Sequence, residues 1–93
     1  MSNTATATTV IVNRLGMHAR PAMMFVEVAS RFPCEVTVRR KDQTECFDGK
    51  SIMQVMMLAA TQGTEIEICA KGDEAGGAIE ELLALIKSKF DEE

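Results

Sequence analysis

Two segments of the sequence alternate strictly between apolar and polar residues, and this pattern constrains the fold more than any other feature. Every second residue is apolar in Cys34–Arg39 and again in Thr64–Ala70. Successive side chains of a strand point to opposite faces, so each segment predicts a strand with one buried face. Because parallel sheets are buried on both faces, these strands predict an antiparallel sheet with helices packed on one side.

Two other segments carry apolar residues at helical spacing. The first stripe runs from Ala22 to Phe32, and Pro33 ends it because the residue before a proline is pushed out of the helical region. The second stripe runs from Ala75 to Phe90. Asp73 precedes it and is expected to be its N-cap. These patterns predict an amphipathic helix after the first strand and another at the end of the chain.

Weaker patterns complete the expected order of elements. Residues 1–8 are polar and are expected to be loose, whereas the β-branched run Val10–Asn13 predicts a first strand. Thr44–Phe47 predicts a short strand after the polar turn that follows the alternating segment. Ser51 and Gln54 have the spacing of a capping box.

The capping box predicts a short helix from Ile52 to about Ala60. The expected order is then β-α-β-β-α-β-α, which is an α+β fold. A chain of 93 residues can bury one hydrophobic core, so residues 1–93 are expected to form a single domain.

Composition excludes several classes of function. The net charge of -4 and the absence of Trp and Tyr argue against nucleic-acid binding. The longest apolar stretch, Ile52–Ala60, is less than half of a membrane span, so membrane insertion is not expected. The first residues lack the basic start and apolar centre of a secretory signal. We therefore expect a cytoplasmic protein.

The only histidine, His18, lies between the expected first strand and first helix. The N-terminus of a helix has free amides and a partial positive charge, so a phosphoryl group is stabilised there. Imidazole suits phosphoryl exchange because its reference pKa of about 6.5 leaves a neutral nitrogen at cytosolic pH. Arg20 can present a planar fork of donors to the phosphate oxygens.

The chemistry of these residues leaves other roles open for His18. It can be an ordinary helix cap or a surface imidazole. A metal site would need further ligands, and a second histidine is absent, so no metal or cofactor is expected. A cysteine-histidine dyad would need one of three scattered cysteines beside His18. These cysteines lie too far apart for a CxxC motif and are expected to be reduced: Cys34, Cys46 and Cys69.

Two blocks of sequence resemble the HPr family of phosphocarriers. The segment Gly16–Ala22, Gly-Met-His-Ala-Arg-Pro-Ala, is similar to the family's active-site signature, and Gly49–Leu58 is similar to its regulatory-serine region. The resemblance covers about Thr9 to Lys89. It implies an open-faced β-sandwich whose four-stranded antiparallel sheet has the order 1-4-2-3, with three helices on one face. It also implies that His18 is the phosphoacceptor, Arg20 the phosphate partner and Ser51 a regulatory site.

The resemblance further implies a function in the phosphoenolpyruvate-dependent phosphotransferase system. His18 would accept a phosphoryl group from phosphorylated enzyme I and pass it to an EIIA-type domain. Such a protein is a stoichiometric carrier rather than an enzyme, and it is expected to be a monomer. A serine kinase or phosphorylase acting on Ser51 is a further implied partner.

A regulatory phosphoprotein of the nitrogen-related branch is the alternative function, in which the phosphorylation state controls partner binding. The segment Leu15-Gly16-Met17 and the acidic C-terminal end are similar to that branch. Lys50-Ser51-Ile52-Met53 is instead similar to the sugar-transport branch. The sequence leaves the two branches open.

The second block carries an apolar pattern of its own. Apolar residues surround the expected short helix almost completely, so one face is expected to remain exposed as an adaptable, Met-rich docking patch. The alternative is that all of these side chains belong to the core. The expected partner-binding residues are Met17, Ile52, Met53 and Met56.

Overall fold

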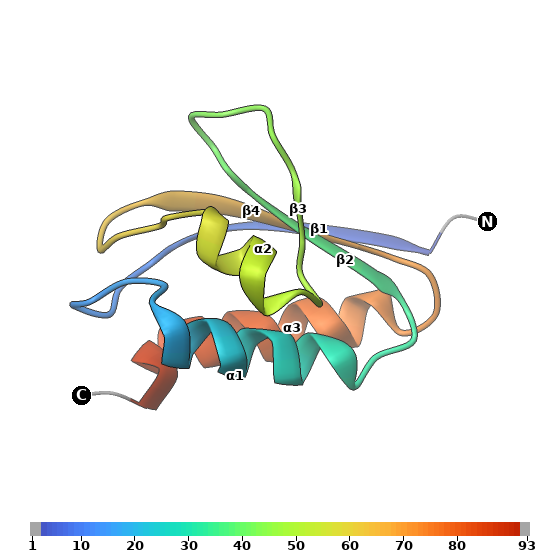
Figure 1. Cartoon of the computed structure of the whole chain (residues 1–93). Coiled ribbons are helices and arrows are strands. Elements are labelled where there is room, and N and C mark those ends of the chain that lie inside the picture. Colours follow the sequence, from blue (N-terminus) through green and yellow to red (C-terminus); the bar gives the residue numbers. More distant parts are fainter. Residues whose placement is uncertain (1–2, 92–93) are drawn as a thin grey trace.

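The computed structural model describes residues 3–91, which form a four-stranded antiparallel sheet with helices against one face (Figure 1). The strand order is β1-β4-β2-β3, as the family resemblance implied. The elements are β1 (Thr4–Val10), α1 (Ala19–Ser30), β2 (Glu35–Arg40), β3 (Phe47–Asp48), α2 (Ile52–Met57), β4 (Glu65–Lys71), α3 (Ala75–Lys87) and the short 3₁₀ helix η1 (Lys89–Asp91). The predicted open-faced β-sandwich is thereby confirmed.

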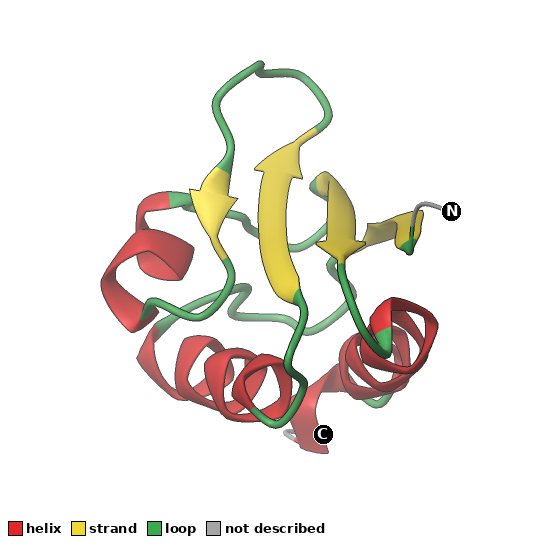
Figure 2. Cartoon of the chain, turned by 90° about the vertical axis from the view of Figure 1, so that its right-hand side faces the viewer, coloured by secondary structure: helices red, strands yellow, loops and turns green. Residues whose placement is uncertain are grey.

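The helices differ in how they meet the sheet. Figure 2 shows α1 and α3 lying beneath the sheet, while α2 lies alongside β3 at one edge. Contacts join α3 to β1 and β4, and α2 to β3 and α1. No helix within residues 3–91 is long and apolar enough to cross a membrane.

The two alternating strands are buried as their pattern predicts. Ile66, Ile68 and Ala70 of β4 are fully buried, and Val36 and Val38 of β2 are nearly so. The polar residues that alternate with these side chains, such as Arg39 of β2 and Glu67 of β4, lie on the open face. There the Arg39 guanidinium donates to the Glu67 carboxylate at 3.0 Å. The period-two pattern therefore identified the buried face of the sheet correctly.

The N-terminal segment is a strand, which corrects two expectations. Residues 4–8 are not loose, because Thr4–Val10 pairs with β4 along its whole length. The predicted strand Val10–Asn13 is instead mostly connection, since β1 ends at Val10. Alternating threonine and alanine give little apolar signal, and the pairing with β4 supplies the missing stabilisation through backbone hydrogen bonds. Residues 1–2 of the segment expected to be loose lie outside the described residues.

Helix and strand ends also differ from the expected ones. The first helix begins earlier, at Ala19, and α2 ends earlier, at Met57. The third strand contains only Phe47–Asp48. The N-cap of α3 is Glu74, with φ of 66°, and not Asp73. Ends are set by local hydrogen bonds that apolar spacing does not report.

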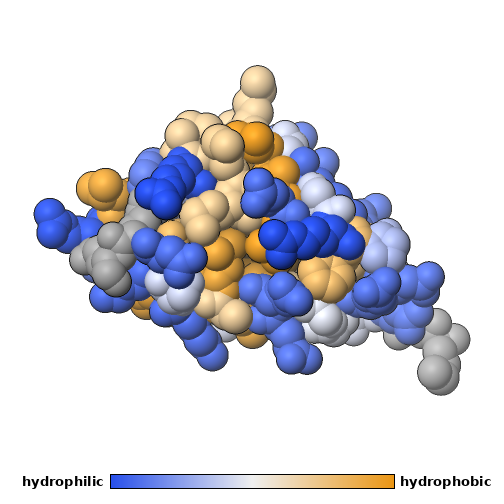
Figure 3. Space-filling model, turned by 90° about the horizontal axis from the view of Figure 1, so that it is seen from below, coloured by the Kyte–Doolittle hydropathy of each residue, from blue (hydrophilic) through white to orange (hydrophobic). Residues whose placement is uncertain are grey.

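One hydrophobic core lies between the sheet and the helices. Its largest fully buried side chains include Phe25 of α1, Leu82 and Ile86 of α3, and Phe90 of η1. Met17 belongs to the same core, with 4% of its surface exposed. Seen from below, hydrophobic residues also reach the surface in the middle of the helical face, with hydrophilic residues on both sides of them (Figure 3).

Candidate phosphoryl-transfer site

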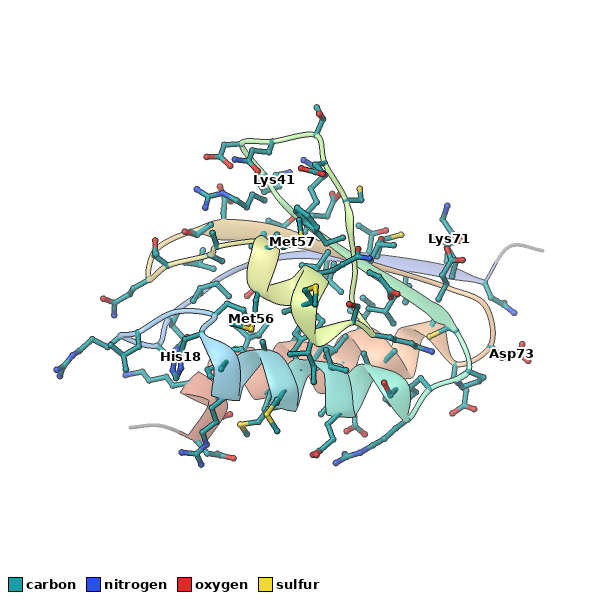
Figure 4. The ribbon with its side chains drawn as sticks, viewed as in Figure 1. His18, Lys41, Met56, Met57, Lys71 and Asp73 are labelled. Atoms are coloured by element: carbon teal, nitrogen blue, oxygen red, sulfur yellow. The ribbon has the colours of Figure 1, made fainter. Side chains whose placement is uncertain are left out.

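His18 occupies the N-cap position of α1, with φ of -83° and ψ of -169°. Its side chain is half-buried and makes no capping hydrogen bond to the helix. The imidazole therefore does not serve as an ordinary cap. His18 lies toward one end of the molecule, with Met56 between it and the middle, and Lys71 and Asp73 lie toward the other end (Figure 4).

The loop that carries His18 is fixed by close packing against the segment after α2. Gly16 has φ of +71°, and a Cβ on it would lie 2.5 Å from the Ala60 carbonyl oxygen. The next backbone amide, of Met17, donates to the same carbonyl oxygen at 2.8 Å. Only glycine adopts this conformation at this distance without strain. His18 therefore follows directly on a tightly positioned turn.

Asn13 stabilises this turn from within and was missed by the sequence analysis, which placed it in a strand. It is fully buried, and its Nδ2 donates to the Gly16 carbonyl oxygen at 2.8 Å. The Gly16 amide in turn donates to the Asn13 carbonyl oxygen at 3.2 Å. An asparagine three residues before a glycine is a turn signal that would have identified this role.

The start of α1 offers donors to an anion. The amides of Ala19 and Arg20 stand in the first turn, where a helix has no internal acceptor for them, and Pro21 carries no N–H. The first turn contains no acidic residue that would repel a phosphate. The Arg20 side chain is exposed and belongs to the same turn. Arg20 lies two residues after His18, in the first turn of the helix that His18 begins.

Ser51 occupies the N-cap position of α2, and half of the expected capping box is present. Its Oγ accepts a hydrogen bond from the Gln54 amide at 3.2 Å. The Gln54 side chain does not reach back to Ser51 as predicted, because its Oε1 accepts from the Asp48 amide at 2.8 Å. Lys50 Nζ donates to the Phe32 carbonyl oxygen at 2.7 Å, which ties this turn to the end of α1.

An apolar surface on α2 is exposed as predicted, although its membership differs. The exposed fractions are 43% for Ile52, 75% for Met53, 43% for Met56 and 61% for Met57. These four residues are called the α2 surface below. Val55 and Leu58 are buried and attach the helix to the core.

Met17 must be removed from the predicted partner-binding residues, because its side chain is in the core. The backbone of Met17 turns inward where its amide meets the Ala60 carbonyl. Two other exposed apolar residues near His18 in the sequence, Leu15 and Met23, were missed. Their exposure depends on how the loop and α1 pack, which helical spacing alone does not report.

Residues 3–91 contain no group of three or more His, Cys, Asp or Glu side chains that could hold a metal ion. Cys34, Cys46 and Cys69 are all free thiols, and Cys34 is buried.

Known proteins resemble this chain in sequence and in fold. The family described as the PTS HPr component phosphorylation site matches residues 5–88. Phosphocarrier protein HPr of Pseudomonas aeruginosa is 50% identical over 82 residues, covering 88% of this chain and 90% of that protein. Phosphocarrier protein NPr of Escherichia coli K12 is 39% identical over 90 residues, covering 97% of this chain and 99% of that protein.

The fold agrees with a solved structure of the same kind. The crystal structure of HPr-C-His from Thermoanaerobacter tengcongensis matches with a TM-score of 0.89 and 40% identity, covering 96% of this chain and 98% of that chain. Sheet order and relatives together define a small phosphocarrier built as an open-faced β-sandwich. The chain belongs to the HPr family of the phosphotransferase system.

Proposed function

We propose that His18 accepts a phosphoryl group from phosphorylated enzyme I and passes it to an EIIA-type domain. The observation that carries this proposal is the half-buried imidazole at the N-terminus of α1, which is not used as a cap. A neutral ring nitrogen of His18 attacks the phosphorus and forms an N–P bond. The bond between the phosphorus and the donor group of enzyme I breaks at the same time, and its electron pair stays with that donor group. Transfer to EIIA repeats these steps with His18 as the leaving group.

The first turn of α1 supplies the electrostatic part of this proposal. The amides of Ala19 and Arg20 and the Arg20 guanidinium stabilise a dianionic phosphoryl group on His18. Their contribution must remain modest, because a carrier has to release the group to the next protein. Because Arg20 is exposed, water screens its attraction to the phosphoryl group and keeps this stabilisation modest. The chain acts in the cytoplasm as a stoichiometric carrier and turns over no substrate of its own.

Two branches of the phosphotransferase system compete for this role, because the relatives include both HPr and NPr proteins. The experiment mixes the chain with enzyme I, labelled phosphoenolpyruvate and purified EIIA domains of the sugar and nitrogen types. We expect label on an EIIA only when the chain is present. The branch is the one whose EIIA is labelled faster. If the EIIA domains were labelled equally well with and without the chain, the result would contradict the carrier role.

Met53→Glu tests whether the α2 surface docks enzyme I. Met53 is 75% exposed, so the substitution should change stability by no more than about 0.5 kcal/mol. A charge in an apolar interface is costly, and KM for the chain in the enzyme I reaction should rise about tenfold or more. Gln43→Glu adds the same charge on the exposed β2–β3 connection and should leave KM unchanged. Equal KM values for both variants would remove the α2 surface from docking.

Ser51→Asp and Ser51→Ala separate regulation from capping. Asp can accept from the Gln54 amide as Ser51 does, whereas Ala removes the cap and should cost about 1 kcal/mol of unfolding free energy. We propose that negative charge beside the α2 surface hinders docking. Ser51→Asp should therefore slow phosphorylation by enzyme I at near-normal stability, and Ser51→Ala should transfer normally. Equal rates for wild type and Ser51→Asp would leave Ser51 a structural cap.

A further inference from the structure

A series of contacts connects the hairpin between β2 and β3 to the loop that carries His18. Arg40, at the end of β2, donates from Nη1 to the Ala59 carbonyl oxygen at 3.0 Å. The next carbonyl, of Ala60, accepts the Met17 amide at 2.8 Å. Met17 immediately precedes His18 in the chain. Two hydrogen bonds on adjacent peptide groups thus separate the Arg40 guanidinium from the candidate phosphoacceptor loop.

The turn at Ala59 needs support from outside. Ala59 follows the C-cap residue of α2 and has φ of 53°, in the left-handed region. Glycine takes this conformation at the end of a helix without steric cost, but alanine does not. Ala59 is also exposed, so core packing of its own side chain does not hold it. The hydrogen bond from Arg40 is a contact that stabilises this conformation.

Arg40 is itself held in a fixed orientation. Its Nε and Nη2 donate to the two carboxylate oxygens of Asp42, at 3.1 and 3.4 Å. The hydrogen bond from Arg40 lowers the pKa of Asp42 below its ordinary value, so this carboxylate is ionised at neutral pH. The planar guanidinium, fixed on one edge by Asp42, presents Nη1 to the Ala59 carbonyl.

Movement of the Ala59 turn would be transmitted to the His18 loop because there is no free space between them. Ala60 is buried, with 3% of its surface exposed. A Cβ on Gly16 would lie 2.5 Å from the Ala60 carbonyl oxygen and 2.8 Å from the Thr61 Cα. Backbones packed this closely shift together, since cores deform little.

We propose that Arg40 is a positioning residue for His18, because it holds the left-handed Ala59 turn against which the Gly16–Met17 loop is packed. Its effect on phosphoryl transfer rests on the function proposed above. The positioning itself does not, and it can be measured in the unphosphorylated protein.

The test compares Arg40→Met with Arg39→Met. Arg39 is a matched control, because its side chain is 24% exposed against 23% for Arg40, and each pairs with one carboxylate. Arg39 donates to Glu67, the Gln43 carbonyl oxygen and the Arg40 carbonyl oxygen, but the described contacts do not include one from it to Ala59.

The first measurement is the hydrogen-exchange rate of the Met17 amide, divided by the rate of the amide of the buried residue Ile68. This ratio removes the effect of changes in global stability. In Arg40→Met this ratio should rise about fivefold, the effect of losing one hydrogen bond. Phosphorylation of His18 by enzyme I should slow by a similar factor at unchanged KM. Arg39→Met should change neither quantity. Ala59→Gly in the Arg40→Met background should restore both to within about twofold, because glycine needs no support at this φ.

Each result decides the proposal. An unchanged Met17 ratio in Arg40→Met, an equal rise in Arg39→Met, or no rescue by Ala59→Gly would each overturn it. If wild type accepts no phosphoryl group, the proposed function fails. The exchange ratios would still show whether Arg40 positions the loop.

Discussion

His18→Ala is expected to accept no phosphoryl group from enzyme I while folding normally. The side chain is half-buried and does not cap α1, so its loss should change the free energy of unfolding by about 0.5 kcal/mol or less. The nucleophile itself is removed, and neither Arg20 nor the helix amides can replace it. The rate should fall below the detection limit of a labelling assay, while the thermal melt should match that of wild type.

Ser51→Ala is the matched control, because it removes the other predicted phosphorylation site and should retain labelling. Loss of label in Ser51→Ala with retention in His18→Ala would move the acceptor to the serine. A lowered melting temperature for His18→Ala would instead assign the imidazole a structural role.

Gly16→Ala should be the most destabilising single-methyl change near the site. Alanine at φ of +71° costs about 1–2 kcal/mol by itself. The new Cβ would also lie 2.5 Å from the Ala60 carbonyl oxygen, and both groups belong to the backbone. A total loss of about 2–4 kcal/mol is expected, together with slower phosphoryl transfer. Chemical denaturation measures the first quantity and the enzyme I assay the second.

Gly63→Ala is the control for this prediction. Gly63 has φ of +90°, but a Cβ there would meet nothing within 4 Å. Gly63→Ala should therefore lose only the conformational part, about 1–2 kcal/mol of unfolding free energy, and keep its transfer rate. Equal destabilisation by the two substitutions would show that the close approach to Ala60 contributes nothing.

The sheet could be predicted from sequence where side chains alternate in hydrophobicity. Ile66 and Ile68 in β4 and Val36 in β2 are buried where period two places them. The first strand could not be predicted in this way, because threonine and alanine differ too little. Thr4–Val10 becomes a strand through its partner β4, which is far along the chain. Tertiary pairing decided the structure where the local signal was weak.

The candidate site shows the same division between local and distant effects. His18 at the start of α1 and Ser51 at the start of α2 followed from short motifs. Met17 is buried, and its amide donates to the carbonyl oxygen of Ala60. The contact of Arg40 with Ala59 joins residues 19 positions apart. Neither has a signature in neighbouring residues, so only the folded chain identifies them.

The chemical identity of the phosphorylated group tests the central claim most directly. The wild-type chain is labelled with enzyme I and labelled phosphoenolpyruvate, and the label is then followed in acid and in alkali. We predict one phosphoryl group per chain, lost in acid and retained in alkali, with the ¹⁵N resonances of the His18 imidazole shifted. Acid-stable label and unshifted His18 resonances would place the phosphoryl group on a hydroxyl and contradict the account.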